Sequence, residues 1–207
     1  MNYNDEERIK RKNMAMNGGN EENVMQEITS IYDGAVNLHG VECIFAEQQI
    51  GDFPCYIYMP EQFRLLTDEE KEILFARTKP PKYAYGADEL FLFLSVNITD
   101  SPMKNEQIRM FTSASRGPLE ALIPQSKVYK TYITEIDNKN VGHAELVSGG
   151  IFGKIYNLMM FVSIDDRLLI INIYTQNELK KTVFPYMKQM AESLRIIEEN
   201  VDAADNI

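Results

Sequence analysis

The stretch IYNLMMFVSIDDRLLIINIY, residues 155–174, decides the fold. It joins two apolar runs through Asp165-Asp166, and adjacent aspartates are typical of a tight turn. The first run is apolar in both of its alternating sets, which are Tyr156, Leu158, Met160 and Val162 on one side and Ile155, Met159, Phe161 and Ser163 on the other. Successive side chains of a strand point to opposite faces, so both faces of this hairpin need cover. We therefore predict a central hairpin of a covered sheet.

Further strands flank this hairpin in the sequence. Leu90–Thr99 is a continuous apolar run that predicts a strand buried on both faces. Val128–Ile136 and Val141–Ser148 alternate and are separated by Asp137-Asn-Lys-Asn140, which predicts a second hairpin. An earlier pair, VNLHGVECIFAEQQ and FPCYIYMP, is divided by Gly51-Asp52, which suits a turn with glycine at positive φ. Strands joined as hairpins predict an antiparallel sheet.

Three helical segments are expected beside the strands. Thr67-Asp-Glu-Glu70 matches a capping box and predicts a helix over residues 68–77. Helical spacing over residues 104–123 is interrupted by Gly117-Pro118, which predicts a break there. The last helix carries one apolar stripe, and Pro185 predicts that this helix begins only near Thr182. The stripe consists of Leu179, Val183, Met187, Met190, Leu194 and Ile197.

Charge divides the chain of 207 residues into three parts. Residues 1–30 are polar and predict an N-terminal arm, partly helical or flexible, whose deletion changes stability only slightly. Residues 31–197 hold the apolar segments and predict a single α+β domain. Residues 198–207 contain four acidic and no basic side chains, which predicts a solvated acidic tail.

Composition narrows the class of protein. A net charge of −10 opposes binding to nucleic acid. No apolar run reaches the roughly 20 residues of a membrane helix, so no membrane span is predicted. With no signal peptide evident and only two cysteines, we expect a cytoplasmic protein in which Cys43 and Cys55 stay free, although a longer turn centred on Gln49 would bring them together.

The sequence contains few candidates for chemistry. It has two histidines, His39 and His143, and none of the usual nucleotide-binding, metalloprotease or serine-hydrolase motifs. His143 lies in the alternating run VGHAELVS, which favours a structural histidine on a strand. A hydrolase would use His143 with Ser148 or Glu145. We predict no catalytic residues, no cofactor and no metal site.

The pattern of residues 52–197 resembles a known family. Its marks are YMPEQFRLLTDEE, the prolines of KPPKYAY, LFLFLSVNITDSPM, KNEQIRMF and the closing ESLRII. These resemble the PsbP-like fold family in its bacterial DcrB-type form, which includes chaperones of secretion effectors. The resemblance implies an α+β fold with an antiparallel sheet of six or seven strands and helices packed on both sides. Asp166 departs from the family, which tends to have glycine at this turn position.

Two functions follow from these observations. The first is a non-enzymatic protein-binding module, an adaptor or chaperone for a secreted or membrane-inserting effector, with a protein or an apolar helical segment as its partner. The predicted partner-binding residues are Tyr156, Leu158, Met159, Met160, Met187 and Met190, because flexible methionines suit adaptable apolar surfaces. The alternative is a small ligand-binding protein or hydrolase with a pocket between sheet and helices. The oligomeric state stays open, a homodimer included.

Overall fold

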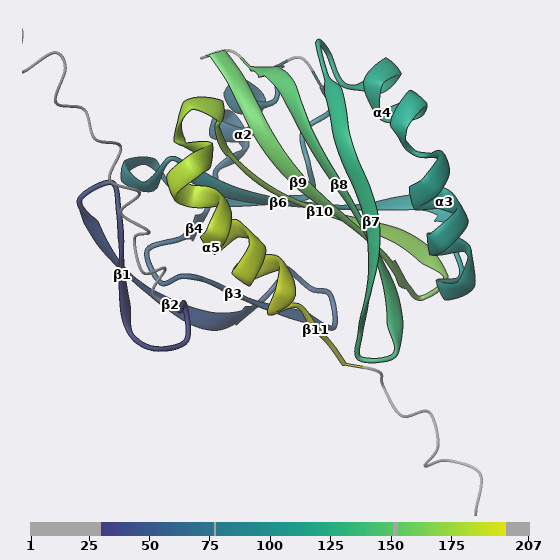
Figure 1. The fold of residues 1–207 in the computed structure, drawn as a ribbon, viewed down its shortest axis with the longest axis horizontal. Helices are drawn as coiled ribbons and strands as arrows, with labels where there is room; N and C mark the ends of the chain where they lie inside the picture. Colours follow the sequence, from purple (N-terminus) through teal and green to yellow (C-terminus); the bar gives the residue numbers. More distant parts are fainter. Residues whose placement is uncertain (1–29, 77, 151–152, 198–207) are drawn as a thin grey trace, which may run out of the picture.

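The computed structural model describes residues 30–76, 78–150 and 153–197. Nearly all of the predicted arm and the whole acidic tail lie outside these residues. The described part is α+β and contains a seven-stranded and a four-stranded antiparallel sheet (Figure 1). The predicted α+β class and sheet of six to seven strands are confirmed.

The large sheet has the strand order β4-β5-β6-β10-β9-β8-β7. Its strands are β4 (Arg64–Leu65), β5 (Tyr83–Ala87), β6 (Leu92–Pro102), β7 (Lys127–Ile136), β8 (Lys139–Gly150), β9 (Gly153–Ile164) and β10 (Arg167–Gln176). The predicted hairpin is β9–β10, in the register Ile164↔Arg167. Asp165 and Asp166 have φ values of 50° and 53°, as expected for the two central residues of a type I′ turn, whose twist matches that of the strands.

The small sheet combines both ends of the domain. Its order is β1-β2-β3-β11, with β1 at Ala35–Leu38, β2 at Val41–Gln49, β3 at Cys55–Pro60 and β11 at Arg195–Ile196. The predicted first hairpin is β2–β3, but its loop is longer than the two residues Gly51-Asp52, because Gln49 pairs with Tyr56. Gly51 has the predicted positive φ, 58°, and a Cβ there would overlap the ring of Tyr83.

Both cysteines lie in the small sheet as free, buried thiols, as predicted. Cys43 pairs across the sheet with Val36, and Cys55 pairs with Ile196. The alternative turn centred on Gln49, which would have brought the two cysteines together, does not form. Burial raises the pKa of the Cys55 thiol to about 12 and keeps it protonated.

The first helix, α2 (Asp68–Leu74), has the predicted capping box. The Glu70 amide donates to Thr67 Oγ1 at 3.3 Å, and the Thr67 amide donates to the Glu70 carboxylate at 2.8 Å. Arg64 pairs with the same carboxylate at 2.6 Å and, through this hydrogen-bonded contact, holds the pKa of Glu70 at about 2. The helix ends at Leu74 with Phe75 as its C-cap, earlier than the predicted Arg77.

The predicted broken helix consists of α3 (Ile108–Ala114) and α4 (Arg116–Leu122), after a 3-10 turn at Asn105–Gln107. The break lies at Ser115, just before Gly117-Pro118, because proline is tolerated in the first turn of α4. The last helix, α5 (Lys180–Glu192), begins at Lys180, so the start predicted near Thr182 is wrong. A 3-10 turn at Asn177–Leu179 leads from β10 directly into α5, and Pro185 lies in its interior.

The helices cover both faces of the large sheet, as predicted. The ring of Phe184 on α5 packs edge-on against Tyr156 with centroids 5.5 Å apart, so α5 lies on the face of the even-numbered β9 residues. The ring of Phe111 on α3 packs edge-on against Phe161 at 5.2 Å, so α3 lies on the opposite face. Figure 1 shows α5 between the two sheets and α3 and α4 beside β7.

Candidate ligand cavity

A cavity of about 700 Å³ lies on the face of the large sheet opposite α5. Its walls are Leu74 and Phe75 at the end of α2 and Ile123 and Pro124 after α4. Its floor spans four strands and consists of Phe93, Ser95 and Asn97 on β6, Ile170, Asn172, Tyr174 and Gln176 on β10, Ile155, Asn157 and Met159 on β9, and Ser148 on β8. Thus α2 and α4 cover the two sides of this face and leave the middle open.

A row of hydrogen-bonded polar side chains crosses the floor. Asn172 Nδ2 donates to Asn157 Oδ1 at 3.0 Å, and Asn157 Nδ2 donates to Ser148 Oγ at 3.0 Å. We call Ser148, Asn157 and Asn172 the amide row. They belong to three adjacent strands, β8, β9 and β10, and point to one face. The row gives an otherwise apolar cavity an uncharged polar centre.

Two polar atoms of the floor have no hydrogen-bond partner among the described residues. They are Asn172 Oδ1 and the hydroxyl of Tyr174, and both are buried. Tyr174 is only 8% exposed, and burial raises the pKa of its hydroxyl, which stays protonated. A buried polar group without a partner costs about 1–3 kcal/mol. Asn172 and Tyr174 therefore carry unused hydrogen-bonding capacity at the cavity.

Aromatic rings pack around Tyr174. The ring of Phe93 stacks on it with centroids 5.5 Å apart, and the ring of Phe75 meets it edge-on at 6.0 Å. Phe93 in turn lies against Gly86 of β5, where a Cβ atom would overlap its ring. The glycine in the run YAYGA thus positions an aromatic side chain of the cavity.

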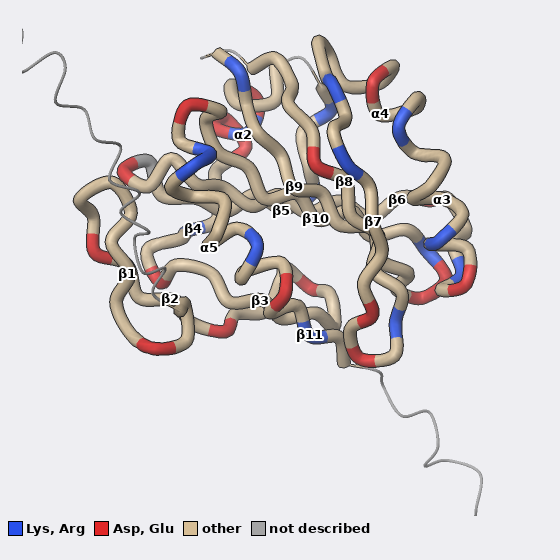
Figure 2. Tube along the Cα trace, viewed as in Figure 1, with Lys and Arg blue, Asp and Glu red and all other residues tan. Residues whose placement is uncertain are grey.

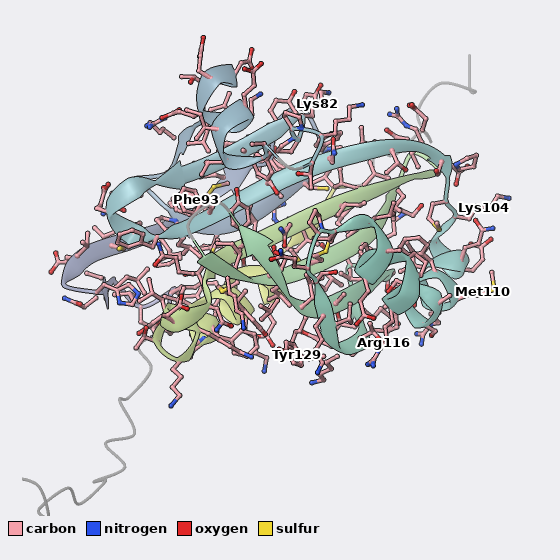
Figure 3. All side chains as sticks on the ribbon, turned by 90° about the horizontal axis from the view of Figure 1, so that it is seen from above. Lys82, Phe93, Lys104, Met110, Arg116 and Tyr129 are labelled. Carbon is pink, nitrogen blue, oxygen red and sulfur yellow. The ribbon has the colours of Figure 1, made fainter. Side chains whose placement is uncertain are left out.

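Electrostatics distinguish the cavity from the outer surface. Among its described lining residues, Lys79 alone is charged, and its side chain is exposed. Elsewhere both acidic and basic residues are distributed along the chain trace (Figure 2). Met110, Arg116 and Tyr129 lie along the α3–α4–β7 side, apart from Phe93 (Figure 3). The cavity is therefore a neutral site on a charged protein.

The structure separates the six predicted partner-binding residues. Five of them, Tyr156, Leu158, Met160, Met187 and Met190, are fully buried in the core between the large sheet and α5. They do not form the open surface that we expected there, because α5 covers the face to which they point. Met159 points to the other face and lines the cavity. Partner binding by these residues stays a prediction.

His143 lies on the α5 face, beside a smaller cavity of about 250 Å³. Its Nε2 is 2.7 Å from Thr134 Oγ1, and its ring stacks on Tyr132. Its Nδ1 is buried and has no hydrogen-bond partner within residues 30–76, 78–150 and 153–197. Burial lowers the pKa of His143 to about 4, so the imidazole is neutral at pH 7. Ser148 lines the large cavity on the opposite face, so it cannot form a Ser–His pair with His143.

Glu145, the other partner named for a hydrolase, accepts a hydrogen bond from the Tyr156 hydroxyl at 2.7 Å. Across residues 30–76, 78–150 and 153–197, no three His, Cys, Asp or Glu side chains are grouped so that they could hold a metal ion. The helices of this described part are too short or too polar to cross a membrane.

Comparisons with known proteins find similarity to solved structures but none in sequence. No family model matches the chain, and no curated protein matches it in sequence. Among solved structures, it is similar to the cyanobacterial PsbP of Synechocystis, with 10% identity and a TM-score of 0.49, over 80% of this chain and 99% of that one.

Two further solved structures are similar in shape. One is PA94 of Pseudomonas aeruginosa, a protein of unknown function, with 11% identity and a TM-score of 0.42 over 76% of this chain and 99% of that one. The other is LpqN of Mycobacterium tuberculosis, a protein involved in cell envelope biogenesis. It has 11% identity and a TM-score of 0.41 over 75% of this chain and 92% of that one. Likenesses at this level assign neither function nor ligand.

Sequence reasoning missed Asn157, Asn172 and Tyr174 as site residues. A signal for two of them exists, because Asn157 and Asn172 are amides inside the apolar runs IYNLMM and IINIY. A polar side chain at such a position must be satisfied inside the protein or by a ligand. Phe75 had no comparable signal, because its place in the wall depends on where α2 ends.

Proposed function

We propose that this chain is a non-enzymatic binding protein and that its cavity holds a small, largely apolar ligand. The observation that supports this proposal is the cavity itself, about 700 Å³ between the large sheet, α2 and the end of α4. Small-molecule sites measure roughly 300–1,000 Å³ and combine apolar walls with a few placed polar groups. The rings of Phe75, Phe91 and Phe93 and the amide row fit that description.

The proposal develops the predicted alternative of a pocket between sheet and helices. The other prediction, a chaperone or adaptor that holds an apolar helix on Tyr156, Leu158 and Met160, would require α5 to leave its face. Such a movement would expose a large part of the core, at a cost of about 25 cal/mol for each Å² of apolar surface. A ligand that enters the existing cavity avoids this cost.

Titration with the neutral, apolar fluorophore N-phenyl-1-naphthylamine tests the proposal. We expect saturable binding with one site per chain. Ile170→Trp, at a half-buried position of the floor, should weaken binding at least tenfold by filling the space. Asn97→Trp, which fills it from β6, should have the same effect.

Ile44→Trp is the matched control, because Ile44 is 48% exposed on β2 and lies outside the cavity. It adds the same bulk and should leave the affinity unchanged. Thermal melts establish that each variant is folded. Equal affinity of the wild type and both cavity-filling variants, with all of them folded, would show that the fluorophore binds elsewhere and would overturn the proposal.

A further inference from the structure

The floor of the cavity contains, on one strand, a hydrogen-bond donor and an acceptor that have no partners in the part of the chain that the structure describes. Asn172 and Tyr174 are two residues apart on β10, so their side chains point to the same face. Asn172 Oδ1 is a carbonyl oxygen and can only accept, and Nδ2 of the same amide already donates to Asn157. The Tyr174 hydroxyl is protonated and can donate. Together they can meet a group that both donates and accepts a hydrogen bond.

The surrounding charges restrict the type of group. Lys79, the one charged side chain among the described lining residues, is exposed, whereas Asn172 is half-buried and Tyr174 is buried. A carboxylate or an ammonium group at the floor would lose its hydration without gaining a counter-ion. An uncharged group avoids this penalty and can satisfy both buried atoms.

We infer that the ligand is an amphiphile with one uncharged head group that both donates and accepts a hydrogen bond, such as the hydroxyl of a long-chain alcohol, bound to Asn172 and Tyr174. The head donates to Asn172 Oδ1 and accepts from the Tyr174 hydroxyl. Its apolar chain lies against Met159 and Ile170. This inference rests on the proposed function and specifies the ligand class of the same cavity.

Access to the Tyr174 hydroxyl involves Phe75. The hydroxyl is buried, and the Phe75 ring packs edge-on against Tyr174 at the end of α2. Phe75 is the C-cap residue of α2 and is half-buried, so its side chain is only partly enclosed. The head group reaches the Tyr174 hydroxyl by displacing this ring.

Competition against N-phenyl-1-naphthylamine with three probes tests the head group. 1-Decanol donates and accepts, decyl methyl ether only accepts, and decanoate is ionised at pH 8. We expect 1-decanol to compete about three- to tenfold better than the ether, the effect of one hydrogen bond. Decanoate at pH 8 should compete at least tenfold more weakly than the alcohol.

Tyr174→Phe tests the protein side of the contact. It should weaken 1-decanol binding about three- to tenfold. It should not lower the melting temperature, because the lost hydroxyl has no hydrogen-bond partner among the described residues. Tyr156→Phe is the control on the opposite face, where the hydroxyl donates to Glu145, and it should not change 1-decanol binding.

Three results would overturn the inference. They are equal competition by the alcohol and the ether, tighter binding of decanoate than of the alcohol at pH 8, and unchanged alcohol affinity in folded Tyr174→Phe. Any of them, obtained while Ile170→Trp still blocks the fluorophore, refutes the head group and leaves the cavity as a binding site. Failure of Ile170→Trp to block the fluorophore refutes the proposed function instead.

Discussion

At the scale of single residues, the buried side chain of His143 makes the stability of the fold depend on pH. Its pKa is about 4 in the folded protein, whereas an unfolded histidine titrates near 6.5. The unfolded chain therefore binds this proton more readily than the folded one. The stability that the neutral His143 imidazole contributes to the folded state is fully present above about pH 6.5. It is lost as the pH falls from there towards 4.

We expect the loss to reach about 3 kcal/mol of unfolding free energy in the wild type. His143→Phe keeps a ring that can stack on Tyr132 and removes the titrating group. Urea unfolding of the wild type and of His143→Phe at pH 7.5 and pH 4.5 isolates the contribution of His143 to the fall in unfolding free energy. The carboxylates contribute the same fall in both proteins. The same fall in both proteins would contradict a buried neutral histidine.

At the scale of elements, the β9–β10 turn carries avoidable strain. Both Asp165 and Asp166 have positive φ, and type I′ turns favour glycine at the second position. Asp166→Gly should raise the unfolding free energy by about 0.5 kcal/mol, and Asp166→Ala should lower it. The Asp166 carbonyl that accepts from the Met103 amide at 2.7 Å is retained in both variants. Urea unfolding in which the glycine variant is less stable than the wild type would refute this account.

The capping box of α2 positions one wall of the cavity. Thr67→Ala removes the side chain that accepts from the Glu70 amide and should cost about 1 kcal/mol in urea unfolding. Ser113→Ala is its control, because Ser113 is exposed inside α3 and caps no helix end. If the two variants lose equal stability, the cap does not hold α2.

Elements differ in how well their sequences predict them. The β9–β10 hairpin and the cap of α2 rest on neighbouring residues, so local patterns were sufficient. The pairing of β11 with β3 joins residues 195–196 to residues 55–56, and no local pattern encodes it. α5 begins at Lys180 and not near Thr182, because the 3-10 turn at Asn177–Leu179 leads directly into it and Pro185 is accommodated in its interior.

At the scale of the whole molecule, the site depends on which face each helix covers. Both alternating sets of β9 are apolar, so the sequence did not decide whether Met159 or Met160 would lie under α5. The packing buries Met160 in the core and leaves Met159 in the cavity. The cavity is the space that α2 and α4 do not fill, and it becomes defined only once all the elements are packed.

These two adjacent methionines allow the most direct test of the central claim that the cavity is the binding site. The protein is labelled with ¹³C at its methionine methyl groups, assigned with Met159→Leu and Met160→Leu, and titrated with N-phenyl-1-naphthylamine. We predict that the Met159 methyl signal shifts with saturation. The signals of Met160 on β9 and of Met187 and Met190 on α5, all buried between the large sheet and α5, should not shift. Shifts at Met160 and Met187 with an unchanged Met159 signal would place binding on the α5 face and contradict the account.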